Sequence, residues 1–207
     1  MRKPSFSIVF AVSVVLLPMS LAIAQESARF SHVPEERAKV LGKSFDHKKL
    51  PAGAQIHVDS TQVFSLVASN APELTILPVD FSVKRQKDEP QYQCGVLFLS
   101  PNGTSNFVLT SEQEDIQDSQ ICENISAIGK MPDPGARPRL LLLFNFSAMN
   151  GNPYKKPYLL VWDETSNNYK VDRTTSHWLV EQTDSETIAG LKRLLAKPGP
   201  KIPQGKY

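Results

Sequence analysis

The residues of this chain best suited to covalent or metal chemistry are two cysteines and four histidines. Cys94 and Cys122 stand in no C-x-x-C motif, and no histidine lies near either one. The histidines are scattered without the paired spacing that a zinc site needs, and they are His32, His47, His57 and His177. We therefore predict a structural disulfide between Cys94 and Cys122 in an oxidising compartment. A free reactive thiol is the alternative, and no metal or cofactor is expected.

The familiar catalytic motifs are absent. The sequence contains no G-x-S-x-G, no H-E-x-x-H, and no Walker or dinucleotide-binding glycine pattern. Adjacent carboxylates occur at 114–115 and 163–164, in positions typical of helix starts and polar turns. Asp163, Thr165 and Asn167 alternate like the start of a calcium loop, but the required glycine and distal glutamate are missing. We assign no catalytic residue and interpret these acids as solvated.

The segment 150–162, "NGNPYKKPYLLVW", combines aromatic and cationic residues between two prolines. No acid occurs between Asp133 and Asp163, whereas arginines and lysines do. Aromatic and cationic groups on a proline-stiffened loop suit the recognition of an acidic partner. The candidate partner-binding residues are Tyr154, Lys155, Lys156 and Tyr158. The alternative interpretation is a connecting loop with hydrated lysines.

The N-terminus has the three-part pattern of a secretory signal. Arg2 and Lys3 precede an apolar stretch over 8–17, and Ala22-Ile23-Ala24 supplies small residues for cleavage after Ala24. An uncleaved anchor helix is disfavoured because the apolar stretch is shorter than the roughly 20 residues that a bilayer requires. We expect a signal peptide over 1–24 and a periplasmic or secreted product without a transmembrane anchor.

Charge and length limit the function further. The chain of 207 residues has 23 Lys and Arg and 21 Asp and Glu. Removing Arg2 and Lys3 with the signal leaves equal numbers, so the basic surface typical of nucleic-acid binding is not expected. We predict an N-terminal arm or short helix over 25–50, a single domain over 51–197, and a flexible tail over 198–207.

Strand patterns dominate the domain. Residues 54–60, 62–69 and 74–86 alternate as strands do, with the last interrupted at Pro78. Residues 92–111 predict a hairpin around Pro101-Asn102-Gly103, and 156–173 predict a second one. Leu140–Phe144 has apolar residues on both faces, which favours a central strand covered on each side over a buried helical turn or an exposed docking patch.

Two segments have helical patterns. Over 111–131, Ile116, Ile121, Ile125 and Ile128 form a stripe with Cys122. Over 183–197, Thr183 and Glu186 form a capping box, and one apolar face contains Ile188, Leu191, Leu194 and Leu195. The order of elements predicts an α+β fold, with a mostly antiparallel sheet, two or three packed helices and one disulfide.

These observations predict an exported, non-enzymatic protein that binds another protein, of the inhibitor, immunity or envelope-accessory type. The alternative is a small periplasmic enzyme that acts on cell-wall material through an unrecognised polar site. A ligand-binding protein with a pocket between sheet and helices is a third hypothesis. A cleft with convergent acids or histidines would favour an enzyme, and an aromatic and basic face would favour partner binding.

Overall fold

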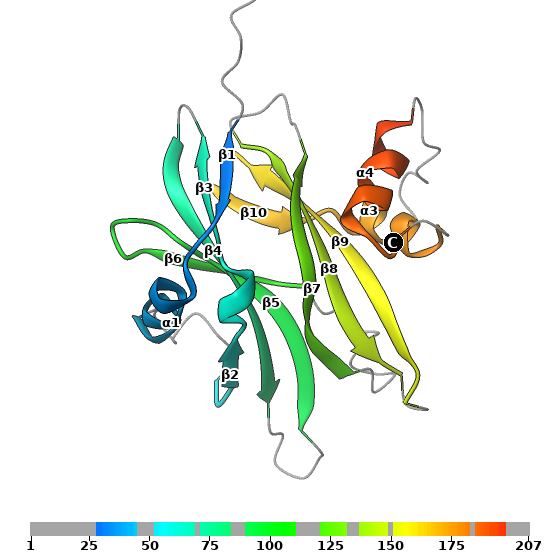
Figure 1. Ribbon diagram of the computed structural model, residues 1–207, viewed down its shortest axis with the longest axis horizontal. Helices are drawn as coiled ribbons and strands as arrows, with labels where there is room; N and C mark the ends of the chain where they lie inside the picture. Colours follow the sequence, from blue (N-terminus) through cyan, green and yellow to red (C-terminus); the bar gives the residue numbers. More distant parts are fainter. Residues whose placement is uncertain are drawn as a thin grey trace, which may run out of the picture.

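Two antiparallel sheets pack face to face, and helices cover the outer face of each sheet (Figure 1). This computed structural model describes residues 28–44, 52–68, 71–83, 90–110, 121–131, 137–148, 151–182 and 185–197. The predicted signal peptide and the predicted tail lie outside these residues. None of the helices in the described ranges is both long enough and apolar enough to cross a membrane.

The first sheet has six strands in the order β1-β3-β4-β5-β6, with β2 also paired to β4. A 3-10 turn, η2 (Ser60–Gln62), joins β2 to β3. Two strands share one side of β4 because β3 pairs with its first half and β2 with its second half. The strands are β1 (Arg29–His32), β2 (Gln55–Val58), β3 (Phe64–Ala68), β4 (Ala71–Val83), β5 (Gln91–Leu99) and β6 (Ser105–Leu109).

Pro78 does not interrupt β4, contrary to the sequence prediction. The strand pairs continuously with β5 on one side, and Pro78 lies opposite Val96. The Pro78 carbonyl accepts a hydrogen bond from the Asp59 backbone N–H at 3.4 Å, on the side where β3 gives way to β2. Because the nitrogen of a residue in an antiparallel strand points to the same side as its carbonyl, the missing N–H costs no hydrogen bond to β5.

The second sheet has the order β10-β9-β8-β7, and its strands are β7 (Ile121–Met131), β8 (Arg139–Ser147), β9 (Pro153–Asp163) and β10 (Asn168–Val171). Its β8 confirms the predicted central strand. Leu140, Leu142 and Phe144 enter the core between the sheets, while Leu141 and Leu143 pack under the helices. Both predicted hairpins are also present, as β5–β6 and β9–β10.

The helix predicted over 111–131 is wrong for its second half, because residues 121–131 form β7; residues 111–120 lie outside the described chain. Two bulges interrupt the pairing of β7 with β8. Each bulge adds one residue, so inward-facing residues recur every three positions rather than every two. Cys122, Ile125 and Ile128 therefore share the inner face of a strand, with a spacing that resembles a helical stripe.

Three helices complete the described fold: α1 (Glu35–Ser44), α3 (Arg173–Val180) and α4 (Ile188–Ala196). In α1, Ala38 is buried against the first sheet. In α4, Leu191 and Leu194 are buried on the second sheet as predicted, but its N-cap is Thr187 rather than Thr183, which lies outside the described residues. Helix α3, which is capped by Asp172, was not expected from the sequence.

The disulfide joins the two sheets across their shared core. Cys94 on β5 and Cys122 on β7 have Cα atoms 5.8 Å apart, and both side chains are buried. The predicted bond between Cys94 and Cys122 is therefore present. It connects two strands, and not a helix to a strand as the sequence suggested.

Candidate functional site

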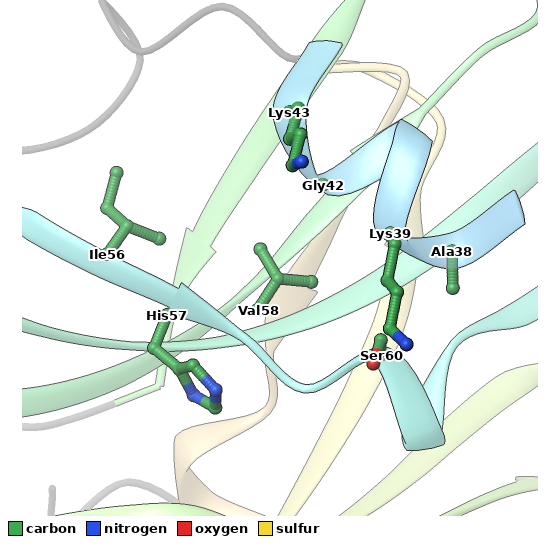
Figure 2. Close-up of a pocket in the computed structure, with 8 residues that line it drawn as sticks. All are labelled: Ala38, Lys39, Gly42, Lys43, Ile56, His57, Val58 and Ser60. Carbon is green, nitrogen blue, oxygen red and sulfur yellow. The ribbon is translucent and has the colours of Figure 1, made fainter. Parts of the chain in front are cut away.

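A surface pocket of about 290 Å³ lies between α1 and β2 (Figure 2). We call it the α1–β2 pocket. Its floor is apolar, and it is made by Ala38 and Gly42 of α1 and by Ile56 and Val58 of β2. Because side chains alternate along a strand, Ile56 and Val58 both face α1, where they pack in the outer core of the first sheet.

Gly42 determines how closely α1 approaches β2. A methyl group placed on Gly42 would lie 3.3 Å from the Val58 Cβ, which is a tight contact. Glycine inside a helix has a conformational cost, and here its lack of a side chain permits the close helix–strand contact. The pocket is therefore bounded by two packed elements.

Polar groups surround this floor. Lys39 and Lys43 of α1 line the pocket one helical turn apart, and Ser60 of η2 lines it from the other element. The Lys39 ammonium lies 2.8 Å from Glu35, and both side chains are about half exposed. Their hydrogen bond lowers the pKa of Glu35 and raises that of Lys39. Lys43 forms no ion pair with any residue in the described ranges.

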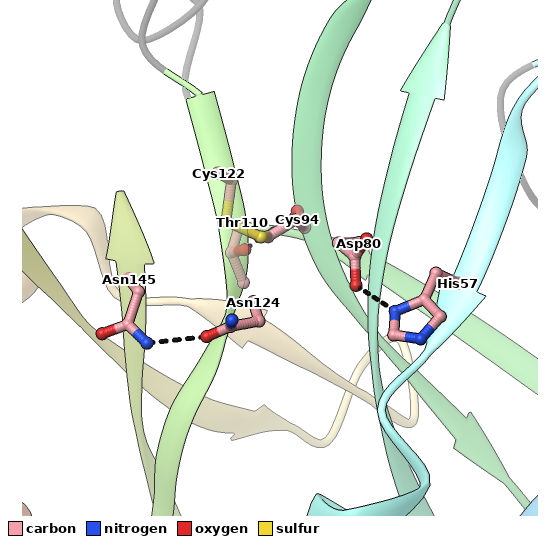
Figure 3. Close-up of a disulfide and its surroundings, with 7 residues drawn as sticks. All are labelled: His57, Asp80, Cys94, Thr110, Cys122, Asn124 and Asn145. Atoms are coloured by element: carbon pink, nitrogen blue, oxygen red, sulfur yellow. Dashed lines mark hydrogen bonds and ion pairs between the residues drawn. A yellow bond between two sulfur atoms is a disulfide. The ribbon is translucent and has the colours of Figure 1, made fainter. Parts of the chain in front are cut away.

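His57 lines the pocket from β2, but its ring lies on the opposite face of the strand (Figures 2 and 3). There its Nδ1 lies 2.8 Å from the Asp80 carboxylate. Asp80 is the ladder partner of Cys94, so His57, Asp80 and the disulfide form one row across the first sheet. This pair could not be predicted from the sequence because its members are 23 positions apart along the chain.

A histidine oriented by a carboxylate is the base component of a catalytic triad. A nucleophile would have to reach the other imidazole nitrogen, Nε2. No hydroxyl or thiol of the described chain hydrogen-bonds to His57, and the sulfurs of Cys94 and Cys122 are bonded to each other. Among the described residues, His57 and Asp80 therefore supply a base and its orienting acid, but no nucleophile completes a triad.

The predicted partner-binding residues do not form one surface, because residues 153–163 are the strand β9 and not a loop. Tyr158 is fully buried in the core between the sheets, so the prediction that it contacts a partner is wrong. Tyr154 stacks on Phe146 on the same face. Lys156 lies 5.7 Å from the Tyr158 ring.

Lys155 lies on the opposite face of β9. It reaches toward the backbone carbonyl of Glu186 at 3.4 Å.

The acid-free basic segment is also divided by the fold. Arg137 is only 3% exposed and lies over the Trp162 ring, with 4.6 Å between the guanidinium carbon and the ring centroid. Its Nη2 donates to the Pro72 carbonyl at 2.6 Å, so it links the second sheet to the first. Burial lowers the pKa of Arg137, and the smaller electrostatic effects of Tyr169 and Glu164 act in the opposite direction. Arg137 is therefore a structural cation of the interior.

The turn after β9 has the polar structure that the sequence suggested. The Thr165 backbone N–H and hydroxyl both donate to Asp163, at 3.0 and 2.5 Å, and Lys170 donates at 3.1 Å. These bonds hold the pKa of Asp163 well below its usual range. Among the described residues, no group of three or more His, Cys, Asp or Glu side chains has an arrangement that could hold a metal ion.

No protein-family model, curated protein or solved structure matches this chain.

Proposed function

We propose that this chain is an exported, non-enzymatic protein that binds another protein, and that the α1–β2 pocket is part of the contact surface. The composition of the pocket carries this proposal. Its floor of Ala38, Gly42, Ile56 and Val58 is apolar, and two lysines and a serine stand beside it. An apolar centre with a polar rim is the usual arrangement of a protein-binding surface.

The size of the pocket also favours partner binding. Pockets for small molecules and cofactors usually have volumes of roughly 300–1,000 Å³ and bury most of the ligand. The α1–β2 pocket, at about 290 Å³, lies just below this range. A pocket of this size suits one anchoring residue of a larger partner.

Two features support export. Ala22-Ile23-Ala24 follows an apolar stretch with a basic start, which is the pattern of a cleaved signal. The disulfide between Cys94 and Cys122 is typical of oxidising compartments. The proposed location is the periplasm or the extracellular space.

An enzyme acting on cell-wall material is the second candidate, and His57 with Asp80 is the observation that favours it. If His57 acts as a base, replacing it with Ala would abolish release of soluble fragments from purified cell wall. The proposed binding protein releases no such fragments in either form.

Site-specific photo-crosslinking in the producing cells tests the proposed function. A photoreactive amino acid replaces Lys43 at the pocket, and in a matched control it replaces Lys192, which is exposed on α4. We expect a protein adduct of one defined mass from position 43 and none of that mass from position 192. The absence of an adduct at position 43, or identical adducts at both positions, would overturn the proposal.

A further inference from the structure

We infer that the α1–β2 pocket binds the C-terminal residue of the partner chain, with its apolar side chain on the floor and its carboxylate between Lys39 and Lys43. This inference rests on the proposed function and specifies the chemistry that the pocket recognises. A protein C-terminus is a known recognition element because its carboxylate marks the end of a chain.

The two lysines are placed to bind one carboxylate together. They are four positions apart on α1, and side chains with this spacing are neighbours on a helix surface, with roughly 5–6 Å between Cβ atoms. Each long, flexible side chain ends in an ammonium group that can turn toward a shared anion. Two charge-assisted hydrogen bonds to the same carboxylate are therefore available.

Within the described part of the chain, neither lysine has a strong partner. The contact of Lys39 with Glu35 is an ion pair between half-exposed side chains, and such pairs are weak. Lys43 has no ion pair with the described residues. A partner carboxylate can replace Glu35 at Lys39 while Glu35 returns to solvent.

The apolar floor distinguishes a chain terminus from an internal acidic residue. The last residue of a chain carries its side chain and its carboxylate on the same Cα atom, so one group reaches the floor while the other remains at the rim. An internal Asp or Glu carries its carboxylate at the end of its own side chain and brings no apolar group to Ile56 and Val58. The juxtaposition of lysines and aliphatic side chains therefore favours a terminus with an apolar last residue.

Ser60 of η2 adds a neutral hydrogen-bonding group to the lining of the pocket. Its hydroxyl can donate to a carboxylate oxygen or accept from the last backbone N–H of a peptide. Figure 2 shows Lys39 extending from α1 in the direction of Ser60. The polar groups thus come from α1 and from η2, the turn that follows β2.

Fluorescence anisotropy with labelled pentapeptides tests this inference. The probes are Gly-Ser-Gly-Ala-Leu with a free carboxylate, the same peptide with a C-terminal amide, and an amidated peptide with an internal Glu. We expect the free acid to bind the exported protein at least about tenfold more tightly than either amide, as the loss of charge-assisted hydrogen bonds predicts. Equal binding of the acid and the amide, or no binding of the acid, would overturn the inference.

Variants of the lysines then locate the binding site. The double variant Lys39→Ala and Lys43→Ala should lose about tenfold in affinity for the free acid and show no change for the amide. Lys192→Ala is the control, and its affinity should equal that of the unsubstituted protein. A similar loss in Lys192→Ala, or no loss in the double variant, contradicts the assignment.

The two proposals fail in different ways. If position 43 crosslinks to a partner but the acid and the amide bind equally, the pocket binds protein without reading a terminus. If position 43 gives no adduct and no peptide binds, both proposals are wrong.

Discussion

Breaking the bond between Cys94 and Cys122 should destabilise the fold substantially. The two residues are 28 positions apart in the chain, and the loop-entropy relation gives about 3.5 kcal/mol for a loop of this length at 25 °C. For a domain of this size, each kcal/mol corresponds to roughly 2–4 °C in Tm, so the reduced protein should melt about 7–14 °C lower. Stability is lost because reduction removes a covalent restraint from the unfolded chain and so raises its conformational entropy.

Urea unfolding followed by tryptophan fluorescence measures this change. Trp162 packs against the core between the sheets and Trp178 against the core under the helices, so the signal reports on both sides of the second sheet. The reduced protein isolates the effect of the bond, since its sequence is unchanged. The Cys94→Ala and Cys122→Ala double variant adds the loss of two buried sulfurs, and it should be at least as unstable.

A difference below about 1 kcal/mol between oxidised and reduced protein would refute this reasoning, because the entropy relation predicts several times more. It would mean that the unfolded chain already holds the two residues close together.

Three further predictions concern single side chains. Gly95→Ala should destabilise the fold by about 1–3 kcal/mol in urea unfolding, because its methyl group would lie 2.4 Å from the Phe107 ring and 2.8 Å from the Val108 carbonyl; wild-type stability would contradict this. Thr187→Ala should cost about 1 kcal/mol by removing the cap that accepts from the Gly190 N–H at 3.0 Å, and Thr187→Ser should restore it; equal losses would exclude capping. Because the folded-state pKa of Asp163 is depressed, the wild type should be more stable than Asp163→Asn at neutral pH, and lose this advantage as the pH falls below about 4; a difference independent of pH would exclude the carboxylate as its source.

Local turn chemistry explains which elements could be predicted. The hairpin predicted at Pro101-Asn102-Gly103 is present. Gly103 adopts the positive φ of 81° that glycine permits. The central strand predicted at Leu140–Phe144 is also present, because five successive apolar residues require cover on both faces. These features depend on neighbouring residues, so they are readable in the sequence.

Bulges and partners far along the chain explain the errors. The isoleucines of β7 resembled a helical stripe because two bulges change the spacing of its inner face. Tyr158 resembled an exposed binding residue because its partner Phe144 belongs to another strand. The α1–β2 pocket was missed because its two walls approach each other only in the folded chain.

The sequence by itself determined the candidate export signal, the cysteine pair, the two hairpins and the apolar face of α4. All but the cysteine pair follow from the types and spacing of residues close together in the sequence. The cysteine pair follows because the chain has no other cysteine. Only the tertiary structure decided that two sheets share one core, that Arg137 is buried over Trp162, and that Lys39 and Lys43 stand beside an apolar floor. The physical reason is that burial and proximity depend on long-range packing between strands and helices, which no local pattern specifies.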